Sequence, residues 1–117
     1  MGDEIVIVAE KITKTEIVDL SQKRFGDMVK AVVDLKRGVM ALGGELHADE
    51  ERVLLDQGSK QDNLWGINIY HALPRGEWIE FDSMINIRPS QGNRSRGVDN
   101  ENLRLQITEL VNHLIVD

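Results

Sequence analysis

The chain has 117 residues, and its 14 lysines and arginines face 20 aspartates and glutamates, which gives a net charge of −6. This acidic balance makes duplex nucleic acid an improbable partner, because such binding depends on neutralising phosphates. The absence of cysteine excludes disulfides, thiolate metal sites and cysteine nucleophiles, and is typical of a reducing compartment. No apolar run is long enough to span a bilayer and no secretory signal is visible, so we expect a cytoplasmic protein with one domain over residues 1–117.

The first elements are a short strand and a helix. Residues 5–9 form an apolar run that predicts a strand. Thr13 and Glu16 have the spacing of a capping box, in which each side chain accepts a hydrogen bond from a free backbone N–H of the other residue. We expect a helix from this point to about Arg24, with Gly26 just after its end.

A hairpin and a second helix should follow. Residues 28–34 and Val39–Leu42 are rich in β-branched and other apolar side chains, and Gly38 between them supplies the positive φ angle that a tight turn needs. Residues 47–57 predict a helix, because acidic side chains crowd its first turn, where the helix dipole favours them. Gly58 should end this helix.

The C-terminal half predicts two more strands and a third helix. Residues 64–70 read as a strand and residues 71–76 as a loop. Residues 77–88 predict a longer extended segment, with a bulge or bend near Ser83. The last helix should begin near Asp99, because apolar residues then recur at helical spacing: Leu103, Ile107, Leu110, Val111 and Leu114.

Together these elements predict an α+β domain with the order β-α-β-β-α-β-β-α. Since hairpins dominate, the sheet of about five to six strands should be mainly antiparallel, with three helices on one face in a two-layer arrangement. A mixed sheet is the alternative.

Polar side chains alternate along the predicted strand at residues 77–88. If this segment is extended, one face carries Trp78, Glu80, Asp82, Met84, Asn86 and Arg88. On the preceding strand, Asn68 and Tyr70 should share that face. The row predicts a shallow polar binding surface; the alternative is an ordinary solvated sheet face, which needs no function.

An arginine-rich loop is the strongest functional candidate. Residues 84–98 contain three arginines and no carboxylate, in a protein that is acidic overall. The guanidinium group suits phosphate and carboxylate, and nearby glycines allow backbone N–H groups to converge on an anion. We therefore expect a small phosphorylated or carboxylated ligand held by Arg88, Arg94 and Arg96, oriented by Asn86, Asn93 and Ser90, with Tyr70 or Trp78 as an apolar wall. Alternatively, the arginines pair with Glu80, Asp82 or the acidic second helix.

Other chemistry has weaker support in the sequence. His47 lies among Glu45, Asp49, Glu50 and Glu51, but the spacing matches no metal motif, and a solvated acidic helix start explains it. We expect no metal and no cofactor, and no named phosphate motif is present. His47 or His71 could act as the acid–base group of a hydrolase, although no partner geometry is visible. A homo-oligomer without a small ligand is a further alternative, whereas single-stranded RNA fits the acidic balance poorly.

Several segments resemble a small family of bacterial proteins of unknown function. The likeness covers nearly the whole chain and is carried by LHAD at 46–49, DQGSKQ at 56–61, LWGINIY at 64–70, WIEFDS at 78–83 and IRPSQGNRS at 87–95. The resemblance implies one intact bacterial domain. It implies no activity and transfers no catalytic residue.

Overall fold

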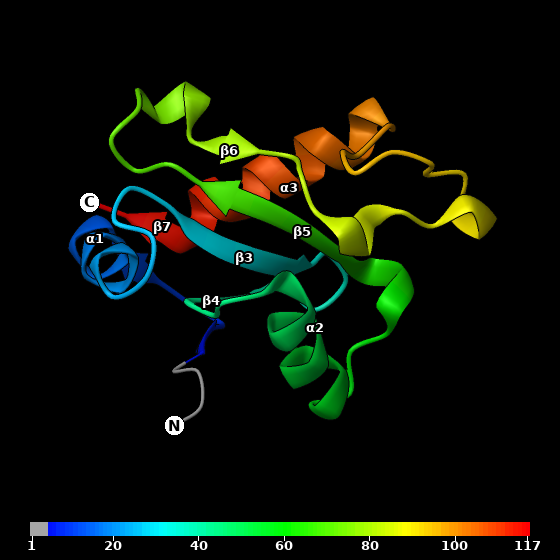
Figure 1. Cartoon of the computed structure of the whole chain (residues 1–117), viewed down its shortest axis with the longest axis horizontal. Coiled ribbons are helices and arrows are strands. Elements are labelled where there is room, and N and C mark those ends of the chain that lie inside the picture. Colours follow the sequence, from blue (N-terminus) through cyan, green and yellow to red (C-terminus); the bar gives the residue numbers. More distant parts are fainter. Residues whose placement is uncertain (1–4) are drawn as a thin grey trace.

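The computed structural model describes residues 5–117 and contains a five-stranded sheet (Figure 1). All neighbouring pairs in this sheet are antiparallel, which confirms the predicted α+β class. In spatial order its strands are β1 (Val6–Val8), β4 (Val39–Leu42), β3 (Val29–Asp34), β5 (Leu64–Ile69) and β6 (Ile79–Glu80). The predicted domain includes residues 1–4, which lie outside the described residues.

Two very short strands form a second sheet that the sequence did not reveal. β2 (Ile12–Thr13) pairs in parallel with β7 (Ile115–Val116). Strands of two residues carry too little periodicity to be predicted from sequence. Their pairing places the N-terminal part of the described chain beside its C-terminal part.

The three helices are α1 (Lys14–Gln22), α2 (His47–Asp56) and α3 (Glu101–Leu114). The capping box before α1 is confirmed, because the Thr13 hydroxyl accepts from the Glu16 N–H at 3.1 Å and the Glu16 carboxylate accepts from the Thr13 N–H at 3.1 Å. The predicted hairpin is also confirmed, and Gly38 has a φ of +69° in its turn. No helix in residues 5–117 has the length and apolar character of a membrane span.

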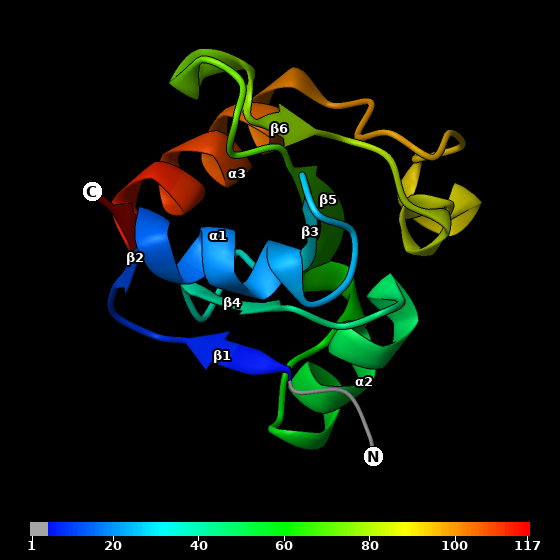
Figure 2. The ribbon, with the colours of Figure 1, turned by 60° about the vertical axis from the view of Figure 1, so that its left-hand side comes forward.

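The helices cover both faces of the sheet (Figure 2). α1 and α3 place Ile17 and Ile107 in a core with Val33, on one face. Successive strand residues point to opposite faces, so Val32 packs on the other side, in a smaller cluster with Leu54 of α2. The arrangement therefore has three layers, whereas the sequence analysis expected all three helices on one face.

The segment at residues 77–88 differs most from its prediction. Only Ile79–Glu80 pairs as a strand, and the chain then makes a 3-10 turn at Met84–Asn86. The Ser83 hydroxyl accepts from the Ile85 N–H at 3.3 Å and so caps this turn. The alternating polar row therefore does not form: Met84 is 65% exposed, whereas Asn86 is fully buried.

Candidate functional site

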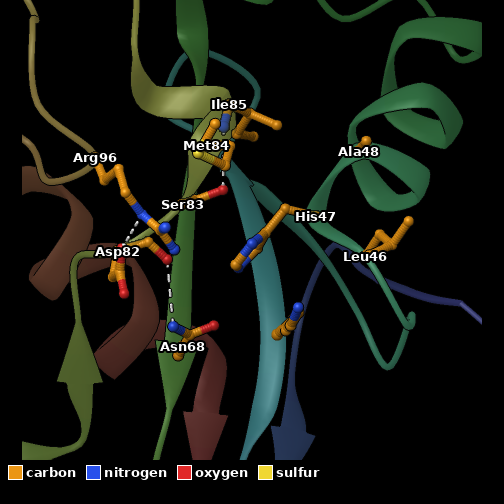
Figure 3. A pocket seen from close by; sticks show the side chains of 10 residues that line it. Leu46, His47, Ala48, Asn68, Asp82, Ser83, Met84, Ile85 and Arg96 are labelled. Atoms are coloured by element: carbon orange, nitrogen blue, oxygen red, sulfur yellow. Dashed lines mark hydrogen bonds and ion pairs between the residues drawn. The ribbon is translucent and has the colours of Figure 1, made fainter.

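A cavity of about 220 Å³ opens on the face of the sheet that α2 covers (Figure 3). The start of α2, the strands β3 and β5, and the loop after β6 all contribute to it. Leu46 and Met84 are 52% and 65% exposed, so they form an apolar rim. The lining comprises Lys30, Leu46, His47, Ala48, Asn68, Asp82, Ser83, Met84, Ile85 and Arg96.

The floor of the cavity is set by strand register. Lys30 on β3 lies directly opposite Asn68 on β5, and Asn68 lies opposite Glu80 on β6. Directly opposed residues share a sheet face with their Cβ atoms about 5 Å apart. Three polar side chains therefore follow one another across the sheet, on the same face as α2.

Asn68 is 6% exposed and is oriented by acceptors on one side. Its Nδ2 donates to Glu80 Oε1 at 2.8 Å and to the Asp82 carbonyl at 3.2 Å. Its Oδ1 is buried and has no hydrogen-bond partner within the described part of the chain. The cavity thus contains a fixed acceptor.

His47, the first residue of α2, is 8% exposed and has a fixed ring. Its Nε2 lies 2.8 Å from the Ile67 carbonyl, which can only accept, so Nε2 carries the proton of the neutral ring and Nδ1 is an acceptor. Burial lowers the pKa of His47, and the charge of Lys30 lowers it further, against the opposing effects of the Ile67 hydrogen bond, the interaction with the Asn68 side chain and the charge of Asp82. The imidazole is therefore a neutral group at physiological pH.

The lowered pKa of His47 predicts a pH dependence of stability. Below about pH 6.5 the imidazole of the unfolded chain binds a proton, while the folded chain keeps it neutral to lower pH. The unfolded state then binds more protons, so the free energy of unfolding should fall as the pH drops from 7.5 to 5.5. Urea denaturation of the wild type and of His47→Gln should show their difference in stability shrinking over this range. Parallel pH curves would contradict the assignment.

Arg96 and Asp82 form an ion pair at the edge of the cavity, with Arg96 Nε 2.6 Å from Asp82 Oδ1. Both side chains are about half exposed, so the pair itself adds little stability. Within residues 5–117 the terminal nitrogens of Arg96 make no hydrogen bond, which leaves them available to an anion. The lining contains two cationic residues, Lys30 and Arg96, and one anionic residue, Asp82, so it carries a net positive charge.

Arg88 is more fully engaged than the other two loop arginines. It is 8% exposed, its guanidinium donates to the carbonyls of Gln61 and Leu64, and it stacks 4.2 Å from the ring centre of Trp65. Burial lowers the pKa of this guanidinium. Its carbonyl partners engage both terminal nitrogens, its Nε is buried without a hydrogen-bond partner among the described residues, and Arg88 does not line the cavity.

The predicted orienting residues mostly hold the loop together. Asn86 is fully buried and spans both backbone groups of Gly66, and Asn93 Nδ2 donates to the carbonyls of Asn86 and Gly97 at 2.7 and 2.8 Å. Ser90 and Arg94 are exposed and lie outside the cavity lining. Of the predicted arginine anchors, only Arg96 lines the cavity.

The two predicted aromatic walls also lie elsewhere. Trp78 is 3% exposed in the core with α1 and α3, and its Nε1 donates to the Leu73 carbonyl at 2.7 Å. The Tyr70 hydroxyl donates to Glu80 at 3.3 Å, and burial together with that carboxylate raises the pKa of Tyr70. Tyr70 therefore holds the Glu80 carboxylate in place and does not itself line the cavity.

The two histidines named as hydrolase candidates are separated. His71 Nε2 lies 2.8 Å from the hydroxyl of Ser21 on α1, and only His47 lines the cavity. The acidic cluster near His47 is not simply solvated, because Glu50 is fully buried and accepts from the Gly44 N–H at 2.9 Å. In the described part of the chain, no group of three or more histidine, cysteine, aspartate or glutamate side chains could hold a metal ion.

Lys30 and Ser83 were not expected from the sequence as site residues, whereas Asn68 was expected only as part of the polar row on the sheet face. A polar Asn68 inside the apolar run of β5 was the available signal, since a buried strand seldom carries an amide without a hydrogen-bonding reason. Lys30 gave no comparable signal, because its position opposite Asn68 depends on register between strands far apart in the chain.

A family model described as a protein of unknown function, DUF5674, matches residues 6–114. The chain belongs to the DUF5674 family. The DUF5674 match extends from β1 to the end of α3, so every element that forms the cavity lies within it. This confirms the expected family of unknown function, while the bacterial origin stays a prediction. No curated protein and no solved structure matches the chain.

Proposed function

We propose that the cavity beside His47 binds a small molecule carrying a carboxylate or phosphate group. The observation that carries this proposal is the cavity of about 220 Å³ in which Lys30 and Arg96 bring cationic groups to an acidic protein. Pockets for small molecules combine apolar walls with a few fixed polar groups. Here Leu46, Met84 and Ile85 provide the apolar part of the lining.

The position of Arg96 supports its role as the main anion contact. Its Nε is held by Asp82, which fixes the plane of the guanidinium and leaves its terminal nitrogens for the ligand. The Asp82 carboxylate opposes an anion placed close to it, so the acid group should lie on the Lys30 side of Arg96. Guanidinium contacts to carboxylate or phosphate are among the stronger hydrogen bonds in proteins.

The test compares two arginines of the same loop. Differential scanning fluorimetry with inorganic phosphate, ethyl phosphate and propionate should detect stabilisation; a ligand at 100 times its Kd adds about 2.7 kcal/mol, or about 10 °C in Tm. Arg96→Gln should weaken binding about 10- to 100-fold, because one or two charge-assisted hydrogen bonds are lost. Arg94→Gln is the matched control and should change affinity less than about twofold.

Two results would contradict the proposal. Equal losses in Arg94→Gln and Arg96→Gln would show that the charge of the loop matters and the cavity does not. No shift with any of the acids, together with a mass that rises with protein concentration, would favour the homo-oligomer that the sequence analysis kept as an alternative.

His47 supports a second candidate function, acid–base catalysis on the bound molecule. A neutral imidazole with a fixed tautomer, lining a cavity, suits proton transfer near neutral pH. Incubating the same probes with the protein and following their NMR spectra tests this candidate, because unchanged spectra exclude turnover of those compounds.

A further inference from the structure

The cavity contains one buried acceptor, Asn68 Oδ1, for which the acid group of the proposed ligand provides no hydrogen-bond donor. Asn68 Oδ1 is buried and has no hydrogen-bond partner among the described residues, although the rest of this side chain is fully engaged. The ring of His47 interacts with the Asn68 side chain, which opposes the lowering of the His47 pKa by burial, but the one proton of the neutral ring is donated to the Ile67 carbonyl. Buried carbonyl oxygens in folded proteins almost always accept a hydrogen bond, because leaving one unpaired costs its solvation. An ionised carboxylate and the dianion of a phosphate monoester only accept hydrogen bonds, so neither provides a partner for this oxygen.

The orientation of this amide follows from its neighbours. Rotating the group by 180° would bring Oδ1 against Glu80 Oε1 and the Asp82 carbonyl, both of which can only accept. The carboxylate of Glu80 is itself held by the Tyr70 hydroxyl. In Figure 3 the Asn68 nitrogen points towards Asp82, and the oxygen points away from it, to the side on which His47 lies. The acceptor is therefore directed into the cavity.

We infer that the ligand carries a hydroxyl or amino group that donates to Asn68 Oδ1, next to its acid group. This inference rests on the proposed function. Lys30 lies directly opposite Asn68 across β3 and β5, so a group held by Lys30 and a group held by Asn68 are neighbours. The chemistry that fits is a short hydroxy acid, an amino acid, or the phosphate ester of a small alcohol with a second hydroxyl or amino group.

The experiment uses compounds that differ only in this donor. NMR titration of the full chain compares propionate with lactate and alanine, and ethyl phosphate with 2-hydroxyethyl phosphate and phosphoethanolamine. In at least one of the two series, the member with a donor should bind about tenfold more tightly than the member without one, because the unpaired acceptor gains its partner. Comparison within a series shows whether a hydroxyl or an amine is preferred.

A variant then connects the preference to Asn68. Asn68→Ala should reduce the discrimination between the paired compounds to less than about twofold, while Asn102→Ala, an exposed asparagine on α3, should leave it intact. The comparison of compounds on the wild type stands even if Asn68→Ala fails to fold. Equal affinity within both series overturns the inference and leaves the proposed function in place, whereas no binding by any compound overturns both.

Discussion

Replacing Gly66 with alanine should destabilise the protein by about 2–3 kcal/mol, a typical cost of overpacking a filled interior. Gly66 lies in the middle of β5, where a Cβ would come within 2.7 Å of both the Cβ and the Oγ of Ser83 and 3.1 Å from Ile85. Ser83 is buried and caps the 3-10 turn, and Ile85 is half-buried within it, so the backbone of that turn must move. The missing side chain at Gly66 is what allows the turn to lie against the sheet.

Gly76 provides the control for this experiment. A Cβ there meets no atom within 4 Å, so Gly76→Ala should change the free energy of unfolding by less than about 0.5 kcal/mol in urea denaturation. Ser83→Gly in the Gly66→Ala background should recover part of the lost stability, because it removes both of the closest atoms. A Gly66→Ala protein as stable as the wild type would show that the turn does not require this close approach.

Asn86→Ala should cost about 3 kcal/mol and should also weaken ligand binding. The Asn86 Oδ1 accepts from the Gly66 N–H at 2.8 Å, and its Nδ2 donates to the carbonyls of Gly66 and Arg96 at 2.9 Å each. Truncation leaves both backbone groups of Gly66 without their partner, at about 1–3 kcal/mol for each group that water does not reach, whereas the Arg96 carbonyl keeps the Ser83 N–H as a donor at 2.9 Å. Because Asn86 supplies one of the two donors to the Arg96 carbonyl, the arginine that lines the cavity loses part of its support.

Asn102→Ala is the matched control, since Asn102 is exposed on α3. Its free energy of unfolding and its affinity for the best phosphate probe should stay within error of the wild type. Hydrogen exchange should show faster exchange at the Gly66 amide in Asn86→Ala. Unchanged exchange and stability would mean that the loop after β6 is held by other contacts, such as those of Asn93.

The sequence singled out the arginine-rich loop as a candidate site but assigned roles to its residues by composition alone. Arg88 and Arg96 are chemically identical in the sequence, yet one is buried against carbonyls and Trp65 and the other lies at the edge of a cavity. The difference comes from Gln61 and Leu64, more than 20 residues away in the chain. No local pattern carries that information.

The extended prediction for residues 77–88 failed for a related reason. Alternation of apolar and polar side chains is typical of a strand, and only β6 obeys it here. Beyond β6, the hydrogen bonds of Asn86 to both backbone groups of Gly66 replace the pairing that a longer strand would have made with β5. A side chain that substitutes for a backbone ladder is visible only once both segments are in place.

By itself the sequence determined the local elements: the capping box at Thr13, the hairpin turn at Gly38 and the helical repeat from Leu103 to Leu114. Each depends on residues a few positions apart, so short-range geometry is sufficient. Only the tertiary structure decided which side chains line the cavity, because Lys30, Asn68 and His47 come together through strand register and the packing of α2 on the sheet. Those contacts join segments about 20 to 40 residues apart, where the order of residues along the chain no longer specifies distance.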